Sequence, residues 1–215
     1  MLRYSYMGAA LWLVVFSGAG YTQEGAMIKL PEPVMTGGKP LMQALKERHT
    51  TREFSSKALS KQDLSNLLWA AGGVNRPASG KRTAPSARDW REIDIYVTLR
   101  EGVYRYDANN HALLLVRNED LRAATGLQDF VAQAPVNLVY VADLNRMEGA
   151  SPENKTLYIG ADTGFIAQNV YLFCASEGLA TVVRGSVDRE ALAKLLGLGK
   201  HQQISLAQTV GYPAQ

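Results

Sequence analysis

The feature that most constrains the fold is the longest helical pattern of the chain, which begins at Pro152 and ends at Glu177. Proline is favoured at the start of a helix, and Gly178 stands where a C-terminal cap is expected. The apolar residues of this pattern occupy more than one helical face and include Leu157, Ile159, Phe165, Ile166, Val170 and Phe173. A helix that is apolar on several sides is buried in a large core or in an oligomer interface. The pattern therefore predicts a substantial core, a partner chain, or both.

Length and composition are consistent with one folded domain. The chain has 215 residues, of which 47% are hydrophobic, enough to build a sizeable core. Its 23 basic and 20 acidic side chains give a net charge of +3 and are mixed along the chain. So mild a charge argues against nucleic-acid binding.

Cysteine and histidine usage excludes two further classes of protein. The single cysteine, Cys174, rules out an intrachain disulfide framework, and its apolar neighbours predict a buried structural thiol. The three histidines, His49, His111 and His201, lie far apart, so the sequence supports no zinc site. No metal site is predicted.

The N-terminus differs from the rest of the chain. Arg3 precedes an apolar run from Met7 to Phe16, and small residues follow from Ser17 to Gly20. This is the layout of a secretory signal peptide, so residues 1–22 are predicted to be a signal peptide or an N-terminal anchor. We expect an exported protein, periplasmic in a bacterium, or a cytoplasmic one if the segment is not a signal. Contact with a membrane is expected only if the segment is not cleaved.

Residues 23–39 contain several Pro and Gly residues without any period and are predicted to form an extended leader. Residues 40–215 should form the domain. Alternation from Ile93 to Leu99 predicts a half-buried strand, whereas the nearly all-apolar run from Val136 to Ala142 predicts a central strand covered on both faces. The other elements that the patterns predict are helices at 40–48, 60–71, 120–125, 127–134 and 188–196, strands at 103–106, 112–116, 179–183 and 204–210, and a loop at 75–82. This order indicates an α+β sandwich around a largely antiparallel sheet.

A basic segment follows the first predicted helix of the domain. Arg48, Arg52 and the hydroxyls of Thr50 and Thr51 lie within five residues. Arginine presents a planar fork of donors that matches phosphate oxygens, and threonine hydroxyls can complete the shell. The alternative is a solvated helix end, because basic residues are favoured in a last helical turn.

Two other segments look able to hold a phosphate-bearing cofactor, although the sequence has no GxGxxG or Walker motif. They are Pro85-Ser86-Ala87-Arg88-Asp89 and Val183-Arg184-Gly185-Ser186. With these segments, and with the closing Thr209-Val210-Gly211-Tyr212-Pro213, the chain resembles the FMN-dependent nitroreductase family over roughly residues 40–213. The hairpin from Gly102 to Asp107 resembles the branch of that family whose dehydrogenases aromatise azoline rings in peptides.

The resemblance implies a three-layer sandwich, with FMN bound at the interface of a homodimer. NAD(P)H and an electron-poor acceptor such as a nitroaromatic or a quinone would react in ping-pong turnover, with no catalytic acid or base required. The resemblance places Arg48, Thr50 and Arg52 at the FMN phosphate and ribityl end. It places Pro85, Ser86 and Ala87 along the flavin, with Asp89 where the family often has an amide. The backbone of Arg184 and Gly185 falls near the flavin N5.

Two departures from the family pattern bear on these expectations. The family often has a further basic residue on the phosphate near the C-terminus, and this chain has none, so Arg82 or Arg88 would have to replace it. An exported enzyme would also meet little NAD(P)H and would need another donor. Two alternatives remain open: a non-catalytic flavin-binding protein on the same fold, and an exported interaction protein with a basic face.

Overall fold

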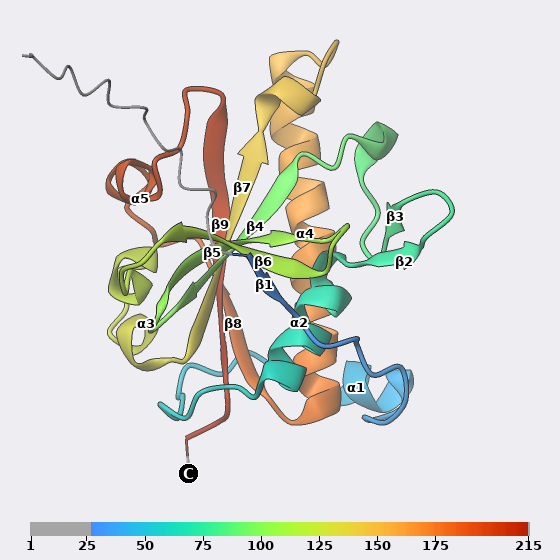
Figure 1. Cartoon of the computed structure of the whole chain (residues 1–215), viewed down its shortest axis with the longest axis vertical. Helices are drawn as coiled ribbons and strands as arrows, with labels where there is room; N and C mark the ends of the chain where they lie inside the picture. The colour runs from blue at the N-terminus through green and yellow to red at the C-terminus, as the bar shows by residue number, and fades with distance from the viewer. Residues whose placement is uncertain (1–26, 215) are drawn as a thin grey trace, which may run out of the picture.

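The computed structural model describes residues 27–214. This part of the chain forms an antiparallel sheet between two helical layers (Figure 1). Seven strands pair in the order β1-β6-β5-β4-β7-β9-β8, and every pairing is antiparallel. The strands of this sheet are β1 (Met27–Lys29), β4 (Ile93–Leu99), β5 (Gly102–Asp107), β6 (Ala112–Arg117), β7 (Val136–Asp143), β8 (Ala180–Arg184) and β9 (Gln202–Gly211). The predicted α+β sandwich is confirmed.

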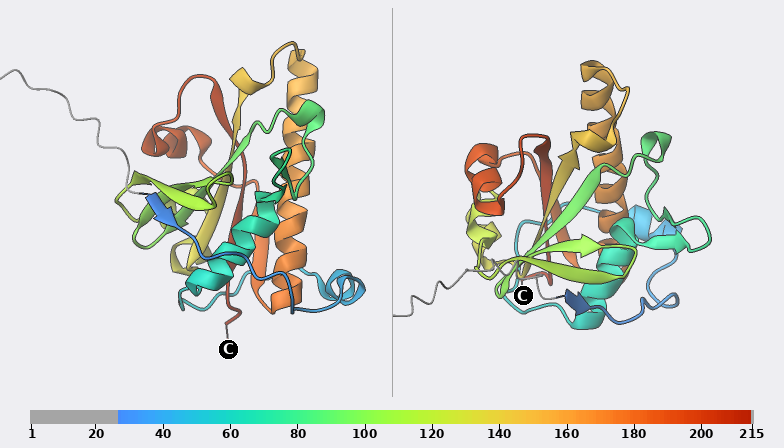
Figure 2. Two further views of the ribbon diagram at one scale, coloured as in Figure 1. Left: turned by 45° about the vertical axis from the view of Figure 1, so that its right-hand side comes forward. Right: turned by 45° about the horizontal axis from the view of Figure 1, so that its top comes forward.

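Two layers of helices cover the sheet, as the two views of Figure 2 show. The α-helices are α1 (Leu41–Glu47), α2 (Lys61–Gly72), α3 (Phe130–Gln133), α4 (Pro152–Glu177) and α5 (Arg189–Leu196), and the 3-10 turns are η1 (Ala87–Asp89), η2 (Arg122–Thr125) and η3 (Leu144–Arg146). The larger core cluster packs α2 and α4 against one face of the sheet. A second cluster packs α5 against the other face. Within residues 27–214, no helix has both the length and the hydrophobicity needed to cross a membrane.

Local signals fix the helix ends. Ser60 Oγ accepts a hydrogen bond from the Asp63 backbone N–H, which caps α2, and Asp188 caps α5 by accepting from the Ala191 N–H. Helix α4 has the predicted bounds, and Gly178 follows it in the left-handed conformation at φ 72°. Only a residue without Cβ adopts that conformation at low cost, so Gly178 ends the helix at this point.

The central strand β7 runs between β4 and β9 and is buried on both faces from Val136 to Ala142, as predicted. The prediction of a half-buried β4 was wrong. Its polar-face residues Asp94, Tyr96 and Thr98 are also buried, because α5 and its neighbouring loops cover that side of the sheet. Alternation of polar and apolar residues therefore did not mark a solvent-facing side here.

Other differences concern short elements. The predicted loop at 75–82 contains a small hairpin of β2 (Val74–Arg76) and β3 (Lys81–Arg82), and the predicted leader contributes β1 to the sheet edge. The helix expected at 127–134 is only the four residues of α3. On α1, Ala44 is buried but Leu41 is 63% exposed, so the apolar stripe is not covered within one copy. Residues 1–22, predicted as a signal or anchor, lie outside the described part of the chain.

Candidate functional site

The basic segment after α1 is attached to the C-terminal half of α4 through Tyr171. The guanidinium carbon of Arg48 lies 5.2 Å from the centroid of the Tyr171 ring. Thr50 Oγ1 lies 3.0 Å from the Tyr171 hydroxyl, and the Thr51 N–H donates to the Thr181 carbonyl of β8. Arg52 is exposed. A cation, an aromatic ring and two hydroxyls thus meet beside a hollow of about 180 Å³ that borders Thr51, Tyr171 and Thr181.

Tyr171 also brings the end of β8 to this segment. Its hydroxyl accepts a hydrogen bond from the Val183 N–H at 3.0 Å, so one side chain joins Thr50 to the residue before Arg184 and Gly185. Gly185 is exposed, and a Cβ added there would meet nothing closer than Leu206 at 3.9 Å. Within one copy, the space above Gly185 is therefore open to another molecule.

The Arg184 side chain points away from this surface and is only 4% exposed. Its guanidinium donates to the Thr125 carbonyl at 2.7 Å, to Thr209 Oγ1 at 3.0 Å and to Asn137 Oδ1 at 3.1 Å. Burial lowers the pKa of Arg184 to about 10. Arg184 can therefore present only its backbone to a ligand beside Gly185, and its side chain serves the fold.

The Pro85 loop contacts the N-terminal half of α4. The Ala87 N–H donates to Asp162 Oδ2 at 2.9 Å, while the exposed Asp89 forms a bidentate ion pair with Arg91 at 2.8 and 2.6 Å. Arg88, Asp89 and Arg91 all have positive φ, at 51°, 57° and 50°. Non-glycine residues in this conformation are uncommon and carry strain, which is typical of segments shaped for a ligand or a partner.

One copy of the chain does not bring all the predicted site residues together. Asp162, which holds the Pro85 loop, and Tyr171, which holds the Arg48 segment, are nine residues apart on α4. At 1.5 Å and about 100° per residue, they lie roughly 13 Å apart along the axis and on opposite sides of the helix. Figure 1 shows the same separation, with the loop beside the upper end of α4 and α1 beside its lower end. The Arg48 segment and Gly185 form one half-site, and the Pro85 loop forms another.

Two carboxyl groups beside the Pro85 loop were not identified from the sequence. Glu92 is fully buried and Asp162 is 2% exposed. The Ser86 hydroxyl lies 3.2 Å from Glu92 Oε2, and the neighbouring Asp162 carboxyl and burial together raise the pKa of Glu92 to about 7, burial being the larger cause. An acidic residue within the apolar pattern of 152–177 was the only available signal, and nothing in the sequence paired it with Glu92.

Arg82 and Arg88, the expected replacements for a C-terminal cation, do not line the hollow beside Thr51. Arg82 lines a cavity beside the Pro85 loop, and the Arg88 guanidinium carbon lies 5.7 Å from the Trp90 ring centroid. Neither cation therefore supports the phosphate end of the Arg48 half-site in the same copy.

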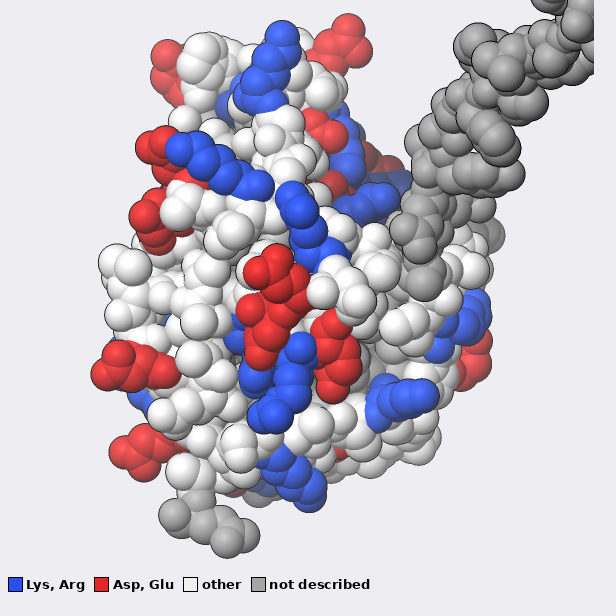
Figure 3. All heavy atoms as spheres, turned by 60° about the vertical axis from the view of Figure 1, so that its left-hand side comes forward, with Lys and Arg blue, Asp and Glu red and all other residues white. Residues whose placement is uncertain are grey.

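The surface over α5 carries both signs of charge (Figure 3). Lysine and arginine side chains alternate there with aspartate and glutamate, and Lys194 pairs with Glu190 at 2.7 Å. On this face the basic surface expected of an interaction protein is absent, because acidic side chains interrupt the cations.

Comparison with known proteins places the chain in a family. The model of the Nitroreductase family matches residues 45–212. A protein of Methanocaldococcus jannaschii that carries the name nitroreductase is 32% identical over 171 residues, which are 75% of this chain and 86% of that protein. A crystal structure of a Ralstonia eutropha protein given the same name is 47% identical, with a TM-score of 0.85, covering 90% of this chain and 92% of that one.

More distant structures share the fold. The NADPH:FMN oxidoreductase of Vibrio harveyi, solved with NAD⁺, has a TM-score of 0.60 at 20% identity, covering 81% of this chain and 69% of that one. The Escherichia coli microcin synthetase complex McbBCD contains a chain with a TM-score of 0.68 at 17% identity, covering 98% of this chain and 85% of that one. At these identities the likeness concerns the fold alone.

Proposed function

Because the chain belongs to the nitroreductase family, a class of flavin-dependent oxidoreductases, we propose that it binds FMN and moves a hydride or electron pair from a reductant to an electron-poor acceptor. NAD(P)H is the expected reductant, and a nitroaromatic or a quinone is the expected acceptor, in ping-pong turnover. The flavin, when bound, supplies the redox chemistry, and the protein supplies binding, orientation and charge.

The observation that carries this proposal is the junction at Tyr171. Arg48 and Arg52 offer two permanent cations and Thr50 offers a hydroxyl, which suit a phosphate that carries close to two negative charges. The same tyrosine accepts from the Val183 N–H, so the open backbone at Gly185 is fixed relative to Arg48 and Thr50. Arg48, Arg52 and Thr50 suit the phosphate end of FMN, and the backbone at Gly185 suits its ring. The Pro85 loop would line the flavin from elsewhere.

A second copy of the chain is proposed to supply that loop. Gly160 and Gly164 lie on an exposed face of α4, where an added Cβ would meet nothing within 4 Å. Mid-helix glycine costs about 1 kcal/mol relative to alanine, so its use here favours close approach of another surface. The same face exposes Leu157 at 62% and Phe165 at 46%, and Leu41, Met42 and Leu45 of α1 add further exposed apolar area. An apolar patch rimmed by polar residues is typical of an interface.

The first test is the absorption spectrum of the purified full-length chain. We expect a yellow protein with flavin bands, or one that acquires them when FMN is added and the excess is removed. Oxidation of NADH or NADPH with a quinone or a nitroaromatic acceptor should then be catalytic, which distinguishes an enzyme from a flavin-binding protein without turnover. A chain that stays colourless after exposure to FMN contradicts the proposal.

Export of the protein is proposed from residues 1–22 alone. Cell fractionation of a tagged chain should place it in the periplasm, and an alternative reductant would then have to be sought among periplasmic donors. Recovery of the full-length chain in the cytoplasm would instead make NAD(P)H the natural donor.

A further inference from the structure

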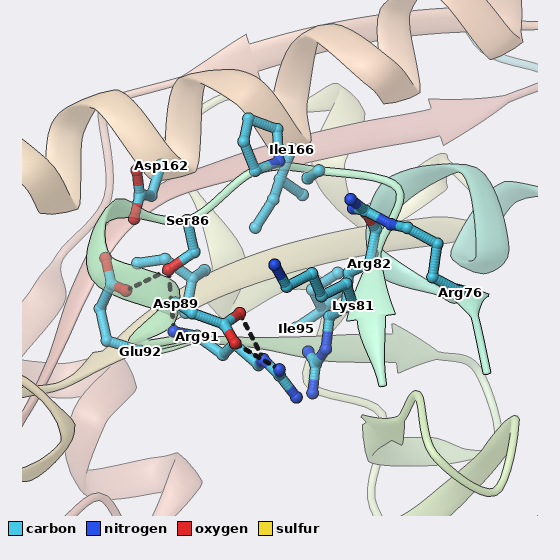
Figure 4. Close-up of a pocket in the computed structure, with 14 residues that line it drawn as sticks. Arg76, Lys81, Arg82, Ser86, Asp89, Arg91, Glu92, Ile95, Asp162 and Ile166 are labelled. Atoms are coloured by element: carbon cyan, nitrogen blue, oxygen red, sulfur yellow. Dashed lines mark hydrogen bonds and ion pairs between the residues drawn. The ribbon is translucent and has the colours of Figure 1, made fainter. Parts of the chain in front are cut away.

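A cavity of about 280 Å³ lies between the β2–β3 hairpin, the Pro85 loop and α4 (Figure 4). Ile95 and Ile166 give it apolar walls. Figure 4 shows Ser86, Glu92 and Asp162 at one end and Arg76, Lys81 and Arg82 at the other, with the Asp89–Arg91 ion pair between them. Ligand pockets commonly measure about 300–1,000 Å³, so this cavity suits a molecule of about one ring.

The cations at one end of the cavity form no ion pair with a carboxylate of the described residues. No ion pair within 4.0 Å joins Arg76, Lys81 or Arg82 to a carboxylate of the described residues, whereas Arg91 is neutralised by Asp89 at 2.6 Å. Arg76 instead donates to the Arg82 carbonyl at 2.8 Å, which holds it against the hairpin.

Arg82 is the most unusual of these cations. It is half-buried, its Nε is enclosed without a hydrogen-bond partner within the described chain, and burial is the main cause that lowers the pKa of its guanidinium. Asp94, whose negative charge acts on Arg82, is engaged in a bidentate pair with Arg146 at 2.7 and 3.0 Å, and Asp89 of the cavity wall is paired with Arg91. An uncompensated cation removed from water is costly for stability, so a structural role does not explain it.

At the opposite end of the cavity, one carboxyl oxygen of Glu92 accepts no hydrogen bond from the described residues. Glu92 Oε1 is buried and makes no hydrogen bond within the described residues, although Glu92 Oε2 accepts from Ser86. Its neighbour is the Asp162 carboxyl, and burial together with that neighbour raises the pKa of Glu92, which favours a proton on Glu92. The groups that face Glu92 are therefore Asp162 from α4 and Ser86 from the loop. A carboxyl that holds a proton can donate to an acceptor atom in the cavity.

We propose that this cavity binds a single-ring aromatic or heteroaromatic carboxylate, with its anionic group on Arg82 and Lys81 and its far end against the Glu92–Asp162 pair. The ring lies against Ile95 and Ile166. The ligand carboxylate forms the ion pair that Arg82 otherwise lacks. An acceptor atom on the ring accepts a hydrogen bond from the protonated carboxyl at the other end. This is a binding site in its own right. Only the further step, that such an acid is the electron acceptor, rests on the proposed function.

The probes are 4-nitrobenzoate and 4-nitrobenzamide, which have similar size and differ in charge. Calorimetric titration of the purified full-length protein at low salt should show at least tenfold tighter binding of the acid. Arg82→Met should remove that preference while leaving the affinity for the amide unchanged. Arg117→Met, which removes an exposed arginine of β6 outside the cavity, should keep the preference.

Equal affinity for acid and amide, or equal behaviour of the Arg82→Met and Arg117→Met variants, overturns the proposal. Loss of bound FMN from Arg82→Met, with the acid preference retained, also overturns it and assigns Arg82 to the cofactor. We expect Arg82→Met to melt at the same or a higher temperature, and Lys81→Met provides a second variant should it fail to fold. The flavin spectrum of the same sample separates the two hypotheses. A colourless protein that prefers the acid supports the cavity and contradicts the proposed function, whereas a yellow protein without preference does the reverse.

Discussion

At the scale of single residues, the two half-sites use charge in opposite ways. Arg52 is exposed and Arg48 is partly exposed, so each cation stays hydrated at little cost until a doubly charged partner binds. Glu92 is fully buried, where a negative charge is costly, so its pKa is raised to about 7 and it keeps its proton below that pH. Tyr171 carries no charge but positions both Thr50 and Val183. The role of Arg48 and Arg52 could be predicted from the sequence. The roles of Glu92 and Tyr171 depend on contacts between distant segments.

Replacing both Arg48 and Arg52 by alanine should weaken FMN binding by at least tenfold. Each charge-assisted hydrogen bond contributes roughly 1.5–3 kcal/mol, and about 1.4 kcal/mol corresponds to tenfold. Fluorescence titration of FMN against the flavin-free protein measures the change. Lys200→Ala, which removes an exposed cation elsewhere, should bind FMN as the unaltered chain does. Equal affinity of both variants would refute the role of the two arginines.

The raised pKa of Glu92 should make stability depend on pH. As pH rises from about 4.5 to about 7, the unfolded chain loses the Glu92 proton while the folded chain keeps it, so this contribution to stability is present at low pH and is lost by about pH 7. The difference of about 2.5 pKa units corresponds to roughly 3 kcal/mol. Glu92→Gln should therefore become more stable relative to the unaltered chain between pH 4.5 and 8. Urea denaturation at several pH values measures this difference.

A matched control for that measurement is Glu190→Gln, because Glu190 is exposed on α5. Its stability relative to the unaltered chain should vary far less over the same range. A difference for Glu92→Gln that is flat with pH would show that the buried carboxyl ionises normally.

At the scale of elements, prediction from sequence succeeded where a local signal marks both ends. The bounds of α4 and α5 were predicted because Ser, Pro, Asp and Gly stand at their termini, and β7 because an apolar run has to be covered on both faces. Strand β1 and the β2–β3 hairpin were missed, since each is two or three residues long and is held mainly by its pairing partner. The candidate site was predicted as three segments, but their distribution over two sides of α4 depends on packing that no local pattern encodes.

Arg184 ties three strands and a turn together, so its removal should be costly. Arg184→Met would leave the Thr125 carbonyl without its donor and would remove the bonds to Thr209 and Asn137. An unsatisfied buried group costs about 1–3 kcal/mol, so the free energy of unfolding should fall by at least that amount. Denaturant titration measures it, with Arg100→Met, an exposed arginine, as the control expected to change little. Unchanged stability would mean that water replaces the guanidinium.

At the scale of the whole molecule, the proposed interface on the apolar face of α1 and α4 would link dimerisation to flavin binding. Phe165→Asp should give a monomer, because it places a charge in the proposed interface at a position that is 46% exposed within one copy and therefore tolerates aspartate in the fold. Light scattering should report half the mass of the unaltered assembly, with circular dichroism unchanged and flavin lost. Ala123→Glu, at an exposed position of η2, should remain a dimer. A Phe165→Asp variant that stays dimeric and yellow would place the interface elsewhere.

The opposite orientations of Asp162 and Tyr171 on α4 have a genetic consequence. If each flavin is held by the cations of one copy and the Pro85 loop of the other, two different inactive variants can repair each other. A chain without Arg48 and Arg52, mixed with a chain whose Pro85 loop is disabled, would form hybrid dimers in which one site has both defects and the other has none. Each hybrid dimer would then have about half the activity of an unaltered dimer. A copy with one defect would therefore still contribute to an active site.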